Sequence, residues 1–366
     1  MMDRAITILT GAAGFLGSAI AVDLSRDRQI IAVDRRRPVE DLVRATKGAL
    51  WHQTDISDKN AVEALFRETV ERFGRVDFVL HFAAFYDFGT RWWPEYERTN
   101  IGGTTMLLQC AMHTNVKRFV FASSIAALLP PPPGGVLTET TPTSDYIPYA
   151  KSKAIGETRV LESSHHVPVA ILRIGGVFSD WCELPPLSSL LRMWTGRLPM
   201  NRLLVGRGTS GFPYIHRADL VTLVRSCLDR HEHLDPAEVL LGCQDGAVSH
   251  KDLWGVVSSE WNPVLSEPVF VPTSAARIGV ALRYALGRLT GWTPYEHPWM
   301  MRYIDRPWVV DTAYTRRRLG WDCTAERGIL ERIPVLLERL RQRRHDWIVR
   351  NDLQNRRHYA YESSLT

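Results

Sequence analysis

The sequence predicts an α/β protein in which helices cover both faces of a parallel sheet, followed by a smaller C-terminal domain. In the first half, short apolar segments alternate with segments whose apolar residues recur at helical spacing, a pattern typical of a doubly wound sheet. After about Ser179 this alternation gives way to a stretch rich in Pro, Trp and Gly. The composition, 45% hydrophobic and 23% charged over 366 residues, excludes a disordered, collagenous or coiled-coil chain.

Six apolar segments are expected to form the strands of the sheet. They occupy residues 5–11, 29–34, 49–56, 77–84, 118–124 and 169–176. Helices are expected directly after the first strand, at 61–74, at about 95–115 and at about 149–164. The second half predicts helices at 218–230, 250–261 and 274–290, and short strands at 239–243 and 268–272.

These elements divide the chain into two domains and a tail. The first domain is expected over 1–178 plus about 212–245, the smaller, substrate-covering domain over 179–211 and 246–340, and a basic tail over 341–366. No run of 18 uncharged apolar residues is present, and the N-terminus lacks the features of a secretory signal. We therefore expect a cytoplasmic protein.

The net charge of +5 is concentrated at the C-terminal end. From Arg316 onward, twelve Arg stand against seven Asp and Glu. Such an end can attract nucleic acid or anionic lipid. The helical apolar spacing of 328–344 would instead turn the arginines toward water, and we expect no nucleic-acid partner. Five scattered cysteines without a CxxC pair predict reduced thiols and no metal site.

A glycine-rich turn follows the first strand and precedes a helix. Gly11, Gly14 and Gly17 would let the backbone approach a pyrophosphate at the helix N-terminus, which predicts a dinucleotide site of the Rossmann type. Asp34, at the end of the second strand, would accept the adenosine ribose hydroxyls and favour NAD. Arg35 and the two arginines after it could instead meet the 2′-phosphate of NADP.

A tyrosine and a lysine lie four residues apart on a predicted helix. Tyr149 and Lys153 share one helix face, and a nearby ammonium together with an oxidised nicotinamide would lower the pKa of the phenol. Ser124 ends the fifth strand, at the sheet edge where doubly wound folds bind ligands. These three residues are the predicted catalytic group.

With these motifs in place, the sequence resembles the extended short-chain dehydrogenase/reductase family over roughly residues 5–335. Within that family it is similar to the NAD-dependent epimerase/dehydratase and 3β-hydroxysteroid dehydrogenase branch. The matching segments are TGAAGFLG (10–17), HFAA (81–84), RTNIGGT (98–104), FASSIAA (121–127), YAKSK (149–153), LRIGGVF (172–178), YIHRADLV (214–221) and LGW…AERGILERI (319–333).

The resemblance implies a role for each matching residue. Ser124 would hold the substrate oxygen, Tyr149 would be the general acid–base, and Lys153 would hold the nicotinamide ribose. Asp55 either contacts the adenine or caps the following helix, and Asn100 either lies near the cofactor or packs within its helix. The cofactor-binding set is Gly11, Gly14, Phe15, Leu16, Gly17, Asp34, Arg35, Asp55, Ile56, Ala83, Asn100, Tyr149 and Lys153.

The departures from the family pattern reduce the number of family reactions that we expect this chain to catalyse. Sugar-nucleotide dehydratases carry an Asp-Glu pair after the catalytic Thr, whereas Ile125 and Ala126 follow Ser124, so dehydration lacks its second catalyst. Many sugar-nucleotide epimerases carry RxFN after the sixth strand, whose Asn reaches the sugar diphosphate. This chain has Arg173-Ile-Gly-Gly there, a form more like the steroid dehydrogenase and ketone reductase branches.

Aromatic residues crowd the segment after the fourth strand. Phe85 and Tyr86 begin this segment, 85–96, and with Ser124 they are the predicted substrate contacts, although aromatics more often fill cores. The helix around 275–292 combines apolar residues with three arginines. The resemblance implies that this region helps to cover the substrate, and the helix either packs on the domain core or lies on a membrane surface.

We therefore expect an NAD(P)-dependent oxidoreductase that transfers hydride between nicotinamide and a hydroxy or keto carbon. The substrate is expected to be a bulky, lipophilic small molecule such as a sterol, terpenoid or acyl compound. The alternative is an NAD-dependent sugar-nucleotide epimerase, and a non-catalytic NAD(P)-binding sensor would not need Ser124, Tyr149 and Lys153. NAD is the expected cofactor, with NADP not excluded. The resemblance implies a homodimer that pairs the helices at about 95–115 and 149–164 across a two-fold axis.

Overall fold

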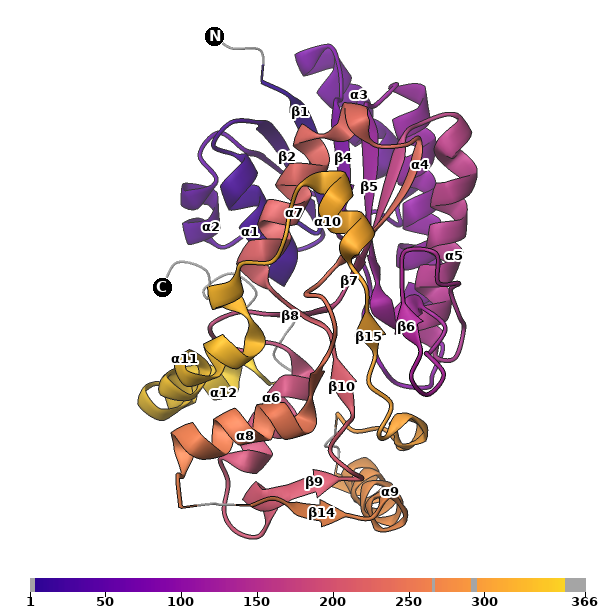
Figure 1. The fold of residues 1–366 in the computed structure, drawn as a ribbon. Coiled ribbons are helices and arrows are strands. Elements are labelled where there is room, and N and C mark those ends of the chain that lie inside the picture. The colour runs from indigo at the N-terminus through magenta and orange to yellow at the C-terminus, as the bar shows by residue number, and fades with distance from the viewer. Residues whose placement is uncertain (1–3, 265–266, 291–294, 353–366) are drawn as a thin grey trace.

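A seven-stranded parallel sheet forms the centre of the computed structural model, which describes residues 4–264, 267–290 and 295–352. The strands run in the order β12-β7-β5-β4-β1-β2-β3, and every neighbouring pair is parallel (Figure 1). This order confirms the predicted doubly wound α/β fold. The strands are β1 (Ile6–Thr10), β2 (Gln29–Asp34), β3 (Leu50–Gln53), β4 (Phe78–His81), β5 (Arg118–Ser124), β7 (Val169–Ile174) and β12 (Ala237–Gly242).

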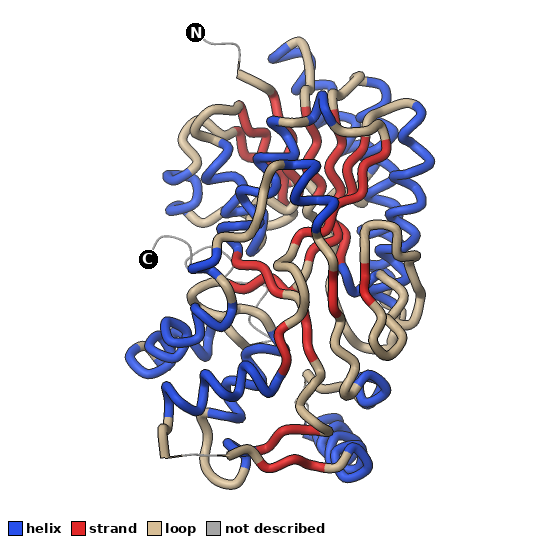
Figure 2. Tube along the Cα trace, in the orientation of Figure 1, coloured by secondary structure: helices blue, strands red, loops and turns tan. Residues whose placement is uncertain are grey.

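Helices cover both faces of this sheet, as Figure 2 shows. One face packs against α1 (Phe15–Leu24), α7 (Arg217–Asp229) and α10 (Ala313–Leu319), and the other packs against α3 (Lys59–Phe73), α4 (Thr104–His113) and α5 (Pro148–Glu162). Successive strand residues point to opposite faces. Ile8 accordingly joins one apolar core, and its neighbour Leu9 joins the other.

The strand order reverses direction at β1, because β2 lies on one side of it and β4 on the other. In open α/β sheets, ligands bind outside the carboxyl ends of the strands at such a switch point. The glycine turn follows β1 at this edge, and Ser124 ends β5 at the same edge. The topology therefore brings the two predicted motifs to one side of the sheet.

A second apolar core lies beyond this edge, in the lower half of Figure 1. Its main helices are α6 (Pro185–Trp194), α8 (His250–Trp261), α11 (Ile329–Gln342) and α12 (Arg344–Arg350). Short strands pair here and at the junction of the two halves: β6 (Val136–Leu137) with β15 (Val309–Val310), β8 (Gly176–Phe178) with β11 (Tyr214–His216), β9 (Leu203–Val205) with β14 (Val269–Val271), and β10 (Gly211–Phe212) with β13 (Val248–Ser249). α9 (Thr273–Thr290) closes the lower end.

Several elements differ from the sequence expectation. The helix expected at about 95–115 begins as a π-helix, Tyr96–Gly103, before α4. The strand expected at 77–84 ends at His81, and α2 (Glu40–Ala45) was not expected. The strand expected at 239–243 is β12, which runs from Ala237 to Gly242 as the edge strand of the main sheet.

The expected basic tail is partly helical. α11 continues through Gln342, and α12 follows with Trp347 fully buried in the lower core. The rest of that tail, residues 353–366, lies outside the described residues. Among the helices that are described, none is long and apolar enough to cross a bilayer.

Candidate active site

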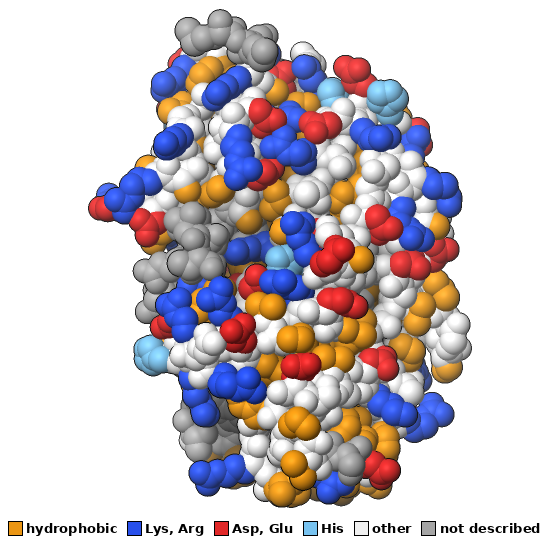
Figure 3. Space-filling view, turned by 60° about the vertical axis from the view of Figure 1, so that its left-hand side comes forward, with side chains coloured by type: hydrophobic (Ala, Val, Ile, Leu, Met, Phe, Trp, Pro, Cys, Tyr) orange, Lys and Arg blue, Asp and Glu red, His pale blue; other side chains and the backbone are white. Residues whose placement is uncertain are grey.

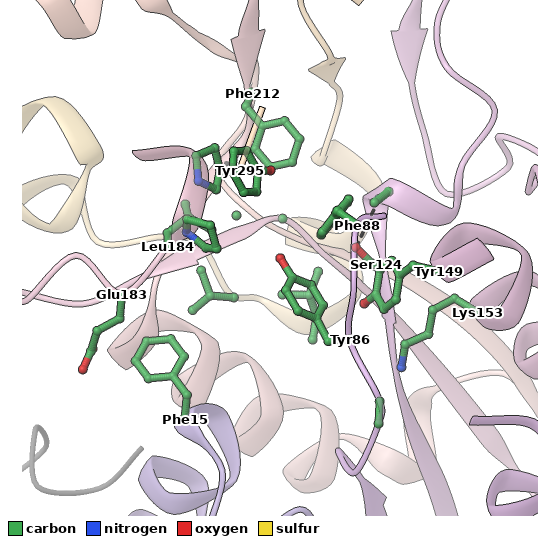
Figure 4. Close-up of a pocket in the computed structure, with 18 of the residues that line it drawn as sticks. Phe15, Tyr86, Phe88, Ser124, Tyr149, Lys153, Glu183, Leu184, Phe212 and Tyr295 are labelled. Carbon is green, nitrogen blue, oxygen red and sulfur yellow. Dashed lines mark hydrogen bonds between the residues drawn. The ribbon is translucent and has the colours of Figure 1, made fainter. Parts of the chain in front are cut away.

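A cavity of about 820 Å³ lies between the carboxyl edge of the sheet and the lower half of the molecule. The glycine turn lines one end, and aromatic residues from several segments line the other. Ser124, Tyr149 and Lys153 line its wall between the two ends. Figure 4 shows these three residues beside Tyr86 and Phe88, with Phe212 across the cavity.

Two positions of the glycine turn require glycine, because a side chain there would collide with neighbouring backbone. Gly11 has φ +74°, and a Cβ there would lie 2.7 Å from the backbone nitrogen of Ala83. A Cβ on Gly17 would overlap the carbonyl oxygen of Gly11. The N-terminus of α1 starts at Phe15, with no acidic side chain in its first turn. A pyrophosphate is favoured at such a helix end.

Asp34 lies buried at the end of β2 and lines the cavity. Its carboxylate accepts hydrogen bonds from the backbone nitrogens of Ala13 and Arg36, each at 3.0 Å. The Arg36 guanidinium also donates to this carboxylate, with Nε 3.1 Å from Oδ1. Arg35 lines the cavity beside it. The carboxylate of Asp34 and the side chains of Arg35 and Arg36 therefore lie together where the adenosine ribose is expected.

Asp55 lines the cavity and does not cap α3. Asp58 is the cap, since its side chain accepts from the backbone nitrogen of Ala61 at 3.2 Å. Partial burial opposes ionisation of Asp55, but a bond from the backbone nitrogen of Ser57 and the charge of Arg98 lower its pKa. The helix-cap alternative is therefore wrong, and a carboxylate faces the cavity.

The predicted catalytic residues lie together on the cavity wall. Ser124 lies beside Tyr149 (Figure 4), and the Ser124 hydroxyl oxygen accepts a hydrogen bond from the backbone nitrogen of Ala126 at 3.1 Å. Tyr149 lies in the first turn of α5, directly after a proline that starts the helix. Lys153 follows one turn later and donates from Nζ to the carbonyl oxygen of Ala122 at 2.7 Å.

Burial sets the protonation of this group. It raises the pKa of Tyr149 well above the ordinary range, with Tyr86 adding to the rise and the Ser124 side chain opposing it. It lowers the pKa of Lys153 to about 8, against an opposing effect of Glu157. In the protein without its cofactor, desolvation therefore raises the pKa of Tyr149, and the lowered pKa expected with oxidised nicotinamide bound stays a prediction.

A buried ion pair that sequence reasoning missed fixes α5 against the sheet. Arg173 on β7 meets Glu157 on α5 with Nη2 2.8 Å from Oε2, and the Ser123 hydroxyl donates to the same carboxylate. Arg173 also donates to the carbonyl oxygens of Glu139 and Thr141. Helical spacing could have indicated that Glu157 faces the sheet, since Glu157 lies four residues after Lys153 on the same helix face.

Asn100 holds the cavity wall and is not part of the cavity lining. Its amide nitrogen donates to the carbonyl oxygen of Phe85 and to the Ser152 hydroxyl, each at 3.0 Å, and its oxygen accepts from the Phe85 nitrogen at 2.7 Å. The neighbouring Thr99 lines the cavity instead. The structure thus gives Asn100 the packing role. The other members of the cofactor set, Phe15, Leu16, Ile56 and Ala83 among them, do line the cavity.

Three of the aromatic residues after β4 face the cavity. The rings of Tyr86 and Phe88 lie 5.2 and 5.3 Å from the ring of Tyr149, and Phe85 lines the cavity beside them. Trp92 packs on Tyr96 and does not line the cavity. The aromatic segment therefore divides between the expected substrate side and the protein's own packing.

A second aromatic wall was not predicted. Its rings come from the segment before α5, from β10 and from the region after α9, and adjacent rings lie 5.7 to 6.5 Å apart. The residues are Tyr146, Phe212, Trp299, Tyr303 and Trp308. Sequence reasoning counted these tryptophans but had no signal to place them, because the fold brings them together from distant segments.

Gly176 occupies the position of the asparagine in the RxFN pattern. A Cβ at Gly176 would lie 3.0 Å from the ring of Phe212 and 3.1 Å from the side chain of Leu184. Apolar side chains therefore fill the space that a polar side chain would need. Among the described residues, no three His, Cys, Asp or Glu lie where they could hold a metal ion, and the five cysteines are free thiols.

Comparison with known proteins places the chain in a family. The model described as "NAD dependent epimerase/dehydratase family" matches residues 7–242. The chain belongs to this family. The NAD dependent epimerase/dehydratase family consists of enzymes, and its description agrees with the cofactor that Asp34 predicts.

Three curated relatives are named for reactions of sugar nucleotides. The chain is 35% identical to a UDP-glucose 4-epimerase of Streptomyces lividans over 150 residues, covering 40% of this chain and 44% of that protein. It is 29% identical over 253 residues to one of Schizosaccharomyces pombe (61% and 70%), and 28% identical over 250 residues to a dTDP-D-glucose 4,6-dehydratase of Mus musculus (63% and 66%). The matched segments thus span 44% to 70% of these relatives.

Solved structures of the NAD dependent epimerase/dehydratase type share the fold. A UDP-glucose 4-epimerase of Thermotoga maritima with UDP-glucose has a TM-score of 0.68 at 20% identity, covering 92% of this chain and 99% of that one. MoeE5 with UDP-glucuronic acid and NAD has a TM-score of 0.66 at 21% identity, covering 93% and 100%. None of the proteins named here is a steroid dehydrogenase, so that branch stays a prediction.

Proposed function

We propose that this enzyme transfers hydride between NAD and a carbinol carbon of its substrate, using Ser124, Tyr149 and Lys153. The observation that carries the proposal is that Ser124, Tyr149 and Lys153 line the same cavity as the glycine turn. Bound oxidised nicotinamide supplies the hydride acceptor and a positive charge. The chain supplies the proton acceptor and the alignment.

Each of the three side chains has one task in the oxidative direction. Tyr149, once ionised, takes the proton of the substrate hydroxyl, and the Ser124 hydroxyl donates to the substrate oxygen as it becomes a carbonyl. Lys153 carries its proton below a pH of about 8, and its ammonium favours the phenolate. The buried Arg173–Glu157 pair keeps α5, and thus Tyr149, in position.

The substrate class best supported by the comparisons is a sugar nucleotide, with 4-epimerisation as the reaction. Two of the three named curated relatives are UDP-glucose 4-epimerases. Epimerisation needs reversible hydride transfer and no second acid–base pair, so Ser124, Tyr149 and Lys153 suffice. Dehydration is less well supported, because buried Ile125 and Ala126 follow Ser124 where a dehydratase needs two carboxylates.

One observation favours a second candidate, net oxidation or reduction of a bulky lipophilic alcohol or ketone. Aromatic rings line both walls beside Tyr149, and Phe212 with Leu184 fills the space around Gly176. Apolar lining of this kind suits an apolar ligand. The comparisons give this candidate no support, so it stands behind the sugar-nucleotide reaction.

A substrate panel separates the two candidates. Purified enzyme is incubated with NAD and UDP-, GDP- and dTDP-sugars, with NAD and sterol, terpenoid and acyl alcohols, or with NADH and the corresponding ketones, while nicotinamide absorbance and products are followed. Epimerisation gives a new sugar without net NADH, whereas a lipid alcohol gives ketone and equimolar NADH. If the Tyr149→Phe variant converted the active substrate at nearly the wild-type rate, the assigned chemistry would be wrong.

We also propose a cytoplasmic homodimer that pairs α5 with the helix preceding β5. The apolar residues expected to drive this pairing are partly used within one chain, since Leu107, Leu108 and Ala111 of α4 are buried. Met106, Cys110 and Met112 pack only partly against the core. Light scattering at micromolar concentration tests the proposal, and a monomeric mass would overturn it.

A further inference from the structure

The helix α9 turns an apolar face toward solvent. Ile278, Leu282, Leu286 and Leu289 recur at spacings of three and four residues, and their exposed fractions are 64%, 60%, 61% and 83%. Residues at this spacing share one helix face. Single exposed leucines are ordinary on protein surfaces, but a row of four large aliphatic side chains on one helix face is not.

The opposite side of α9 faces the protein and lines the cavity. Val280 and Arg283 belong to the cavity lining, and Arg283 pairs with Glu296 at 3.1 Å. Ala276 is buried, and Tyr284 packs against the ring of His297 at 5.4 Å. The exposed apolar row is therefore the outer surface of a helix whose inner surface forms part of the cavity wall.

All the charged residues of α9 are arginines. Its 18 residues include Arg277, Arg283 and Arg288 and no Asp or Glu. Segment 197–207, which leads into and includes β9, likewise carries three arginines and no acidic residue. Arginines flanking an apolar helix face are the pattern of helices that lie in the interface of an anionic membrane.

More exposed apolar residues lie at the same end of the molecule. Val269 and Phe270 on β14, directly before α9, are 43% and 47% exposed. Leu198 and Met200, just before β9, are 66% and 49% exposed, and β9 pairs with β14. Figure 3 shows hydrophobic side chains at the lower end of the molecule, the end that Figure 1 shows to be formed by β9, β14 and α9.

We propose that α9 docks this enzyme on an anionic lipid surface, with the row of Ile278, Leu282, Leu286 and Leu289 inserted among the lipids and the exposed Arg277 facing the headgroups. The cavity would then lie next to the membrane, separated from it by one helix. The proposal goes beyond the proposed function and does not depend on it, because lipid binding is measured without substrate or cofactor.

The test is flotation of the full-length protein with lipid vesicles. We expect it to float with vesicles of equal parts phosphatidylcholine and phosphatidylglycerol, and to bind pure phosphatidylcholine vesicles more weakly. The variant Ile278→Glu/Leu282→Glu should lose at least about tenfold in binding, since each leucine-sized side chain removed from the lipid weakens affinity by about that factor. Arg277→Glu should weaken binding to the anionic vesicles alone.

A matched control adds the same two charges elsewhere. Val39 and Val43, also four residues apart and 39% and 44% exposed, lie at α2, in the other half of the molecule. Val39→Glu/Val43→Glu should float like the wild type, and both double variants should keep the wild-type melting temperature. Equal loss in the two variants, or absence of flotation, would overturn the proposal. A dimer in light scattering that Ile278→Glu/Leu282→Glu dissociates would assign the face to a second copy instead.

Discussion

The Asp34 carboxylate at the end of β2 holds the guanidinium of Arg36, with Arg36 Nε 3.1 Å from Asp34 Oδ1. Both residues line the cavity where the adenosine ribose is expected. While Asp34 is present, it both repels a 2′-phosphate and occupies the arginine that could bind one. We therefore propose that selection of NAD over NADP rests on this pair, more than on the number of arginines that follow β2.

Removing the carboxylate should reverse the cofactor preference. In Asp34→Ala, NAD affinity is expected to fall about 10- to 100-fold, because hydrogen bonds to a charged group are lost. NADP affinity should rise, because Arg36 becomes available. Titration with both reduced cofactors, followed by nicotinamide fluorescence, measures the two constants. The double variant Asp34→Ala/Arg36→Ala is the control, and an equal gain in NADP affinity there would show that Arg36 is not responsible.

The phenol of Tyr149 should be needed for turnover and not for cofactor binding. Tyr149→Phe keeps the ring that packs against Phe88 but loses the acid–base group, so kcat should fall about 10²–10⁴-fold. The cofactor dissociation constant should stay within about threefold of the wild-type value. Ser124→Ala should share the loss in kcat. Near-wild-type turnover of Tyr149→Phe on a confirmed substrate would contradict the catalytic assignment.

The contact between Gly176 and Phe212 should appear as an energetic coupling. Gly176→Asn is expected to lower the free energy of unfolding by about 1–3 kcal/mol through overpacking. Phe212→Ala alone should cost less than the about 3–5 kcal/mol typical of a fully buried Phe, because Phe212 is only partly buried. The double variant should cost less than the two together, because the smaller residue 212 makes room for the amide. Urea denaturation of the four proteins gives the coupling, and strictly additive costs would show that the residues do not compete for space.

His81 should make the protein sensitive to acid. Its ring nitrogens lie 2.8 Å from the hydroxyl oxygens of Thr10 and Thr104, and burial lowers its pKa from 6.5 to about 3. Between these pH values the unfolded chain binds a proton that the folded protein does not, so the free energy of unfolding falls as pH falls. The expected loss attributable to this ring is about 4 kcal/mol between pH 6.5 and pH 3.

The variant His81→Gln isolates that contribution. It should be less stable than the wild type at neutral pH, because the two threonine bonds are altered. Its deficit should shrink as the pH falls, because it has no ring to protonate. Urea denaturation over the pH range gives both curves. His113→Gln, on the exposed surface of α4, should run parallel to the wild type. Parallel curves for His81→Gln would mean that another group causes the acid sensitivity.

The parts of the site that could be predicted are those fixed by local spacing. The strand–turn–helix context placed Gly11, Gly14 and Gly17, and helical spacing placed Lys153 one turn after Tyr149. The aromatic wall containing Phe212 and Trp308 could not be predicted in this way, because it depends on contacts between segments about a hundred residues apart. The raised pKa of Tyr149 depends on burial by Tyr86 and its neighbours, which spacing alone does not reveal.

The π-helix Tyr96–Gly103 makes this segment intolerant of a change in length. In a π-helix each turn closes over one more residue than in an α-helix, and this places Asn100 against the Phe85 backbone and Ser152. Deletion of one residue would let the segment close as an α-helix and rotate everything before it by about 100°. Insertions and deletions here would therefore change the orientation of the aromatic segment relative to Tyr149. Those in an ordinary surface loop would leave the cavity unchanged.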